Sequence, residues 1–195
     1  MPKALILLAD GNEEIEFVSA YDVLTRAEFE VKSVGVSLKI EKYARMSRSV
    51  RIVPDILLTT SLVETGPKVY DMLVIPGGAM GAATFCANDE VLQLIANFRT
   101  KGKWVAAICA ATTALVAARN KFGGDKVLVT SHPSVKHKVQ EEEGWEYSED
   151  GVVVDGKIIT SRGPGFSIAF ALKMVELLQG VEKRNAVAGP MMLPE

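Results

Sequence analysis

The chain has 195 residues, of which 48% are apolar and 24% charged, enough apolar material to bury a full core and to exclude global disorder. The formal net charge of −2 argues against a surface that binds nucleic acid or an anionic membrane. Two cysteines and two histidines exclude a disulfide framework and leave little material for a structural zinc site, so a reduced, soluble, intracellular protein is predicted.

The predicted elements begin with a buried strand at 4–9, a continuous apolar run closed by Asp10-Gly11. This run is too short for a secretory signal, and no apolar stretch of the sequence reaches the ~18 residues that span a bilayer. The apolar period then predicts a helix over 14–27. Its inward face is expected to carry four apolar residues: Ile15, Val18, Val23 and Leu24.

Strands and helices alternate along the rest of the chain. Further strands are predicted at 29–36, 70–75, 103–108, 127–130, 151–155 and 157–160, the last two joined by the turn Asp155-Gly156. Helices are predicted at 79–86, 89–101, 110–119, 166–179 and within 181–195. A basic strand pair or hairpin is expected over 38–54, and the Glu141-Glu142-Glu143 run is expected on a solvated helix face. This alternation predicts an α/β sandwich with a mostly parallel sheet, in a single domain over 1–195.

A nucleophile elbow is predicted where the strand ending at Ile108 runs into Cys109 and then into a helical segment. The tight turn of such an elbow needs small residues two positions before and after the nucleophile, and Ala107 and Ala111 meet this requirement. Backbone N–H groups and the helix dipole at this position favour a thiolate. A small buried cysteine in a core turn is the alternative interpretation of Cys109, and Cys86 is interpreted as a packing cysteine.

Backbone donors for an oxyanion are predicted beside this elbow. Pro76-Gly77-Gly78 ends the preceding strand, and paired glycines let N–H groups approach a ligand closely. The N–H of Ala110, one residue after the nucleophile, is the expected partner donor. An ordinary turn is the alternative interpretation of Gly77 and Gly78.

A buried carboxyl is predicted from the helix that follows the first strand. Glu14 and Glu16 lie about 200° apart around a helix, so if one points to solvent the other points toward the strand ends. A buried Glu16 near a thiol would have a raised pKa and act as a proton donor or general base. His132 also follows a strand end, where a structural hydrogen-bonding role is the alternative to a catalytic one.

With these residues in view, the sequence resembles the ThiJ/PfpI superfamily over its whole length, and most closely its eukaryotic, parkinsonism-associated branch. The segments that carry the resemblance are Gly11-Asn12-Glu13-Glu14-Ile15-Glu16, Tyr70-Asp71, 73–78, 106–110, Ser131-His132-Pro133 and 160–165. The resemblance implies a flavodoxin-like three-layer sandwich with an extra C-terminal helix. It also implies a cofactor-independent, metal-independent homodimer with Cys109 as nucleophile, Glu16 as buried acid and His132 nearby, in the cytoplasm and also the nucleus.

The activity that the resemblance implies is a glutathione-independent glyoxalase, a glyoxalase III-type lyase (D-lactate dehydratase) that converts methylglyoxal to lactate and glyoxal to glycolate. Protein deglycase activity is one alternative, and an oxidative-stress sensor or chaperone-like protein that acts through oxidation of Cys109 to sulfinate is another. A cysteine protease or amidotransferase is disfavoured, because Ala110 stands where the protease-like branch has a histidine. Ala111-Thr112 replaces the Gly-Pro of close relatives, which is expected to reshape the pocket.

Overall fold

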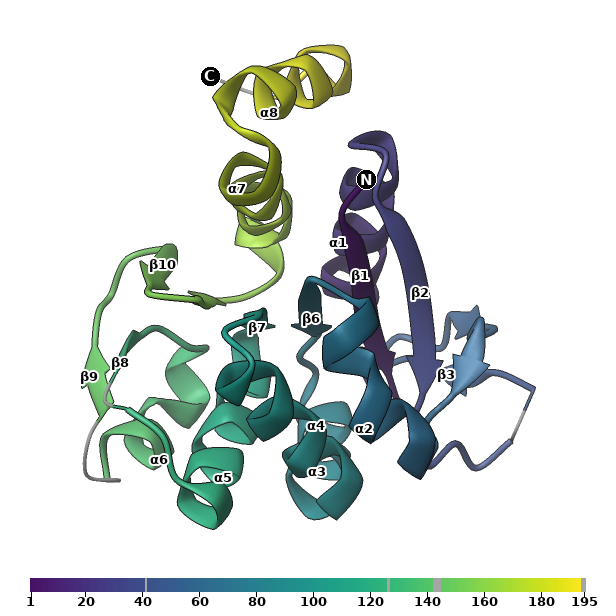
Figure 1. Ribbon diagram of the computed structural model, residues 1–195, viewed down its shortest axis with the longest axis vertical. Helices are drawn as coiled ribbons and strands as arrows, with labels where there is room; N and C mark the ends of the chain where they lie inside the picture. The colour runs from purple at the N-terminus through teal and green to yellow at the C-terminus, as the bar shows by residue number, and fades with distance from the viewer. Residues whose placement is uncertain (41, 126, 142–144, 194–195) are drawn as a thin grey trace.

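A seven-stranded sheet lies between two layers of helices in the computed structural model, which describes residues 1–40, 42–125, 127–141 and 145–193 (Figure 1). The strands are β1 (Lys3–Leu8), β2 (Glu30–Gly35), β3 (Ala44–Arg45), β4 (Arg51–Ile52), β5 (Ile56–Leu57), β6 (Met72–Ile75), β7 (Trp104–Ile108), β8 (Val127–Val129), β9 (Trp145–Tyr147), β10 (Val152–Asp155) and β11 (Ile158–Ser161). The helices are α1 (Glu14–Arg26), α2 (Thr60–Val69), α3 (Ala79–Ala87), α4 (Asp89–Thr100), α5 (Thr112–Phe122), α6 (Lys136–Gln140), α7 (Ser167–Gln179) and α8 (Val181–Ala188).

The strand order of the main sheet is β10-β11-β7-β6-β1-β2-β5, and all neighbours are parallel except β10 and β11. The chain leaves β1 toward β2 and β5 and later returns to the other side of β1 as β6. The sheet therefore has its topological switch point between β1 and β6, where ligands gather in open α/β sheets. The predicted, mostly parallel α/β sandwich is confirmed.

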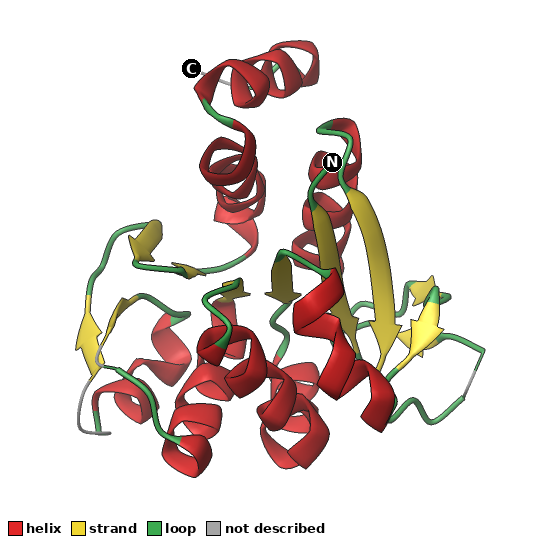
Figure 2. Cartoon of the chain, in the orientation of Figure 1, coloured by secondary structure: helices red, strands yellow, loops and turns green. Residues whose placement is uncertain are grey.

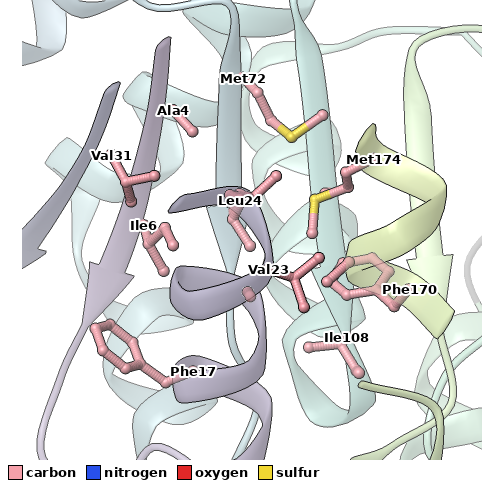
Figure 3. Packing of buried hydrophobic residues seen from close by; sticks show 14 of the residues in the cluster. Ala4, Ile6, Phe17, Val23, Leu24, Val31, Met72, Ile108, Phe170 and Met174 are labelled. Carbon is pink, nitrogen blue, oxygen red and sulfur yellow. The ribbon is translucent and has the colours of Figure 1, made fainter. Parts of the chain in front are cut away.

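Helices cover both faces of the sheet. Since successive side chains of a strand point to opposite faces, each strand buries side chains on both. In β1, Ala4, Ile6 and Leu8 pack in the core beneath α1 and α7 (Figure 3), whereas Leu5 and Leu7 pack in the core beneath α2, α4 and α5. Figure 2 shows the strands of the main sheet between helices on its two sides. Burial on both faces explains why the strands appear in the sequence as continuous apolar runs.

Helix α1 turns only part of its expected apolar face inward. Val23 and Leu24 are fully buried, but Ile15 is 55% exposed and Val18 is 49% exposed. The prediction that all four apolar residues share the inward face is therefore wrong, and the exposed pair leaves an apolar strip on the surface.

Four further segments are not fully as the sequence predicts. The basic hairpin is present as the short antiparallel pair β3–β4, outside the main sheet. The expected strand at β8 pairs in parallel with β9 in a separate two-stranded sheet, and α2 is a helix where none is predicted. The expected acidic helix face lies partly outside the described residues, since α6 ends at Gln140 and Glu142 and Glu143 are not described.

The expected C-terminal helix is α8, which follows Gly180 and packs on α7 (Figure 1). Within the described ranges, none of the helices is both long enough and apolar enough to cross a membrane.

Candidate active site

Cys109 lies in the sharp turn between β7 and α5, as the elbow pattern predicts. Its φ is +63°, a left-handed backbone that L residues seldom adopt, and a single 3-10 turn, η1 (Cys109–Ala111), leads into the helix. Ala107 and Ala111 on either side are fully buried. Larger side chains at these two positions would meet the packed core, so the small-residue spacing has the physical cause that the elbow pattern assumes.

The thiol of Cys109 faces backbone donors from two neighbouring strand ends. The N–H groups of Gly78 and Ala110 contact it, and both lower its pKa. The N–H of Gly77 points elsewhere and donates to Glu16 Oε2 at 2.7 Å. Of the three expected backbone donors, two therefore face the thiol and one holds the carboxyl.

Gly78 needs to be glycine for two reasons. Its φ is +87°, and a Cβ at this position would lie 2.3 Å from the carbonyl oxygen of Gly11. This contact places the turn after β6 directly against the loop after β1, at the switch point of the sheet.

Glu16 is the buried carboxyl of the site. It is 1% exposed, Oε2 accepts the Gly77 N–H, and Oε1 has no hydrogen-bond partner among the described residues. Burial raises the pKa of Glu16 to about 7, and the charge of Glu13 adds to this, whereas the hydrogen bonds from Cys109 and Gly77 lower the pKa. A carboxyl that titrates near neutral pH is suited to both taking up and giving back a proton.

Glu16 and Cys109 form one coupled acid–base pair. Burial, together with the charge of Glu16, raises the pKa of Cys109 to about 12, against the lowering effect of the N–H groups of Gly78 and Ala110. The carboxylate of Glu16 thus disfavours the thiolate form of Cys109 that the elbow position was expected to favour. Once Glu16 takes up the thiol proton, that repulsion disappears, so the thiolate and the protonated carboxyl form together.

Glu14 is also buried, at 8% exposure, which contradicts the expectation that one of the two carboxyls points to solvent. Its carboxylate accepts hydrogen bonds from the Ser47 hydroxyl and from the N–H groups of Arg48 and Val50. These donors come from the loop between β3 and β4, which covers this end of α1. The helical phase between Glu14 and Glu16 is as expected, but the hairpin replaces solvent on the second side.

His132 reaches the nucleophile through its backbone. Its N–H donates to the carbonyl oxygen of Cys109 at 3.2 Å, while Nδ1 of the half-buried imidazole contacts the Ser134 hydroxyl at 2.8 Å and accepts the Ser134 N–H at 3.2 Å. The structure thus brings Cys109, Glu16, Gly77, Gly78 and Ala110 together, with His132 attached at the elbow.

Thr112, part of the departure from the close relatives, is fully buried and donates from Oγ1 to the carbonyl oxygen of Thr130 at 2.9 Å. The second cysteine, Cys86, lies on α3, and its sulfur is 3.3 Å from the Thr113 hydroxyl. Its side chain packs against the core beneath α2, α4 and α5. In the described part of the chain, no group of three His, Cys, Asp or Glu side chains is placed to hold a metal ion.

Asn12 is a site residue that the sequence analysis does not single out. It is fully buried, and its amide bonds to Ala9 N–H and to the carbonyl oxygens of Pro76 and Gly77. The available signal was the Asp-Gly-Asn sequence directly after a buried strand, because Asn side chains often bond to nearby backbone in turns.

The comparisons with known proteins agree with this fold. The model of the DJ-1/PfpI family matches residues 2–177. The chain is 38% identical to the Parkinson disease protein 7 homolog of Danio rerio, covering 99% of this chain and 98% of the relative, and 34% identical to the glutathione-independent glyoxalase DJ-1 of Schizosaccharomyces pombe, covering 100% of both. The crystal structure of Drosophila melanogaster DJ-1beta matches with a TM-score of 0.87 and 36% identity, over 100% of this chain and 99% of that one. The chain therefore belongs to the DJ-1/PfpI family.

Proposed function

We propose that this chain is a glutathione-independent glyoxalase that converts methylglyoxal to lactate and glyoxal to glycolate. The observation that carries the proposal is the pairing of Glu16, whose pKa is raised to about 7 by burial, with the Cys109 thiol on the elbow. The name of the Schizosaccharomyces pombe relative supports the same activity.

In the proposed mechanism, Glu16 takes the thiol proton of Cys109 as the sulfur attacks the aldehyde carbon. The N–H groups of Gly78 and Ala110 stabilise the negative charge that develops on the aldehyde oxygen, and the same proton then passes to this oxygen and gives a neutral hemithioacetal. The ionised Glu16 then removes the carbon-bound proton to form an enediolate and returns it to the neighbouring carbon, while the hydroxyl proton of the former aldehyde passes to the oxygen on that neighbouring carbon. The product is a thioester, and water hydrolyses it to lactate and free thiol.

The test is lactate formation from methylglyoxal without glutathione. Cys109→Ser is expected to lower the rate by more than about a thousandfold, because the covalent step needs the sulfur nucleophile. Cys86→Ser is the matched control, since the sulfur of this cysteine contacts the Thr113 hydroxyl, and it is expected to retain the wild-type rate. A wild-type protein that forms no lactate, or a Cys109→Ser variant of full activity, would contradict the proposal.

An oxidative sensor is the second candidate function, and the unpartnered Oε1 of the buried Glu16 favours it. A protonated carboxyl there can donate to an oxygen on sulfur after two equivalents of peroxide convert the thiol to a sulfinic acid and two waters. In this case intact mass measured after mild peroxide treatment shows a gain of two oxygen atoms on Cys109, without lactate formation from methylglyoxal.

We also propose that two copies of the chain associate through α1 and the β4 region. Val18 and Val53 are 49% and 72% exposed and line one groove of about 470 Å³ together with Tyr21 and Ile52. Such an apolar strip is suited to a second copy of the same surface, as the resemblance to homodimeric proteins implies.

Substituting Asp for Val18 or Val53 is expected to weaken this dimer at least about tenfold, because the new charge would be buried in an apolar contact. Analytical ultracentrifugation over a concentration series measures the change. Val181→Asp, at a residue of 57% exposure on α8, is the control and is expected to leave the dimer intact. A wild-type monomer at high concentration would refute the proposed interface.

A further inference from the structure

The side chain of Asn12 joins the two strand ends at the switch point of the sheet. Its Oδ1 accepts the N–H of Ala9 at 2.6 Å, and its Nδ2 donates to the carbonyl oxygens of Pro76 at 3.1 Å and Gly77 at 2.6 Å. The amide is fully buried, and this assignment of oxygen and nitrogen pairs every donor with an acceptor. The fit is tight, because a Cβ at Gly81 would lie 2.1 Å from Nδ2.

Each carbonyl that Asn12 holds belongs to a peptide unit whose N–H serves the site. A peptide unit is planar, so fixing its C=O also fixes the direction of its N–H. The carbonyl of Pro76 shares a plane with the N–H of Gly77, which donates to Glu16 Oε2 at 2.7 Å. The carbonyl of Gly77 shares a plane with the N–H of Gly78, which contacts the thiol of Cys109.

We propose that Asn12 is the positioning residue of the site, whose amide orients the two successive peptide planes of the 76–78 turn toward the carboxyl and the thiol. The catalytic part of this proposal rests on the proposed function, because it concerns the same pair, Glu16 and Cys109. Gly77 O also accepts the N–H of Glu13 at 3.1 Å, so the second plane keeps one support without Asn12. The carbonyl oxygen of Pro76 accepts a side-chain hydrogen bond from Asn12. The orientation of the Gly77 N–H therefore depends on Asn12 more strongly than that of the Gly78 N–H does.

The charged and titratable groups around the pair come from three segments. Glu13, in the loop before α1, acts on Glu16 by its charge, and Glu16 acts on Cys109. His132, after β8, is attached to Cys109 through its backbone N–H. None of these groups bonds to Asn12 among the described residues, so a change at Asn12 reaches the pair through the 76–78 turn.

The test measures the rate of alkylation of Cys109 by iodoacetamide against pH, in a Cys86→Ser background so that one thiol reacts. The N–H groups of Gly77 and Gly78 lower the pKa of Glu16 and of Cys109, respectively. Misdirecting them in Asn12→Ala is expected to move the alkylation profile about one pH unit higher, which is about tenfold slower alkylation below the midpoint. Asn12→Ser, which retains one donor, is expected to show a smaller shift.

Asn97→Ala is the matched control. Its Nδ2 likewise donates to a backbone carbonyl, that of Val63, at 2.9 Å, but this bond joins α4 to α2 and not the strand ends of the site. It is expected to lower stability without moving the alkylation profile. In lactate formation, Asn12→Ala is expected to lower kcat while KM changes less, since the Gly78 donor acts on developing charge.

An unshifted alkylation profile in folded Asn12→Ala would overturn the proposal. If that variant does not fold, Asn12→Ser decides in the same way, and failure of both to fold would assign Asn12 a purely structural role and overturn it as well. A wild-type protein without glyoxalase activity but with the shifted Asn12→Ala profile would refute the proposed function while leaving the positioning role of Asn12 supported.

Discussion

Replacing Glu16 by Gln is expected to lower lactate formation from methylglyoxal by about 10²–10⁴-fold, with the fold intact. The amide has nearly the same shape as the carboxyl and can still accept the Gly77 N–H, which lies 2.7 Å from Oε2 in the wild type. It cannot take up the thiol proton or move the proton of the hemithioacetal carbon. Steady-state rates of the two proteins, compared at equal helical content by circular dichroism, measure the effect.

The same variant is expected to change how stability depends on pH. The pKa of Glu16 rises on folding from its ordinary value of 4.5 to about 7, so the native state holds a proton that the unfolded state releases. Stability is therefore unaffected below pH 4.5 and falls as the pH rises toward 7, by on the order of 3 kcal/mol for this group.

Denaturant unfolding at pH 4.5 and at pH 8 tests this, because Glu16→Gln should remove that part of the decline. A Glu16→Gln variant that forms lactate at the wild-type rate would refute the proton-transfer role, whatever its stability.

Gly77→Ala is expected to damage both the activity and the fold. A Cβ at this position would lie 2.6 Å from Glu16 Oε2, 2.7 Å from Cys109 Cβ and 2.8 Å from the carbonyl oxygen of Ile108. Relieving these overlaps must separate the carboxyl from the thiol, and displacement of this size costs about a hundredfold or more in rate. The overpacking should lower the free energy of unfolding by about 1–3 kcal/mol.

Gly189→Ala is the control for this glycine, because a Cβ there meets nothing within 4 Å. It is expected to leave the rate of lactate formation and the unfolding free energy near their wild-type values. A Gly77→Ala protein with wild-type rate and stability would show that the close approach of the three groups is not needed for the proposed reaction.

The elbow could be predicted from the sequence because its requirements are local. A buried strand, a nucleophile and small residues on either side lie within a few positions, so Cys109, Ala107 and Ala111 suffice. The alternation of strands and helices is also local in origin and predicted the layered sheet.

Helix α2 could not be predicted, because Gly66 and Pro67 are helix-breaking residues and the compensation lies far away in the chain. Proline has no N–H for the carbonyl oxygen of Val63, and the side chain of Asn97 on α4 donates to that oxygen at 2.9 Å instead.

The burial of Glu14 and the role of Asn12 were missed for a similar reason. The helical period gives the directions of side chains but not the segment that lies in each direction, and the β3–β4 loop comes more than thirty residues later. The bonds of Asn12 likewise cross from the end of β1 to the end of β6, with sequence separations of 64 and 65. Contacts of this range depend on the sheet order, which short-range patterns do not determine.

The left-handed backbone of Cys109 makes stability and reactivity favour different residues at this position. An L residue at φ +63° is strained by about 1–2 kcal/mol, and glycine would remove that strain but also the sulfur. Selection for stability alone would thus favour glycine at this position, whereas the proposed reaction requires the cysteine. A lineage that no longer needs this thiol should lose it first, while the surrounding elbow persists as a turn.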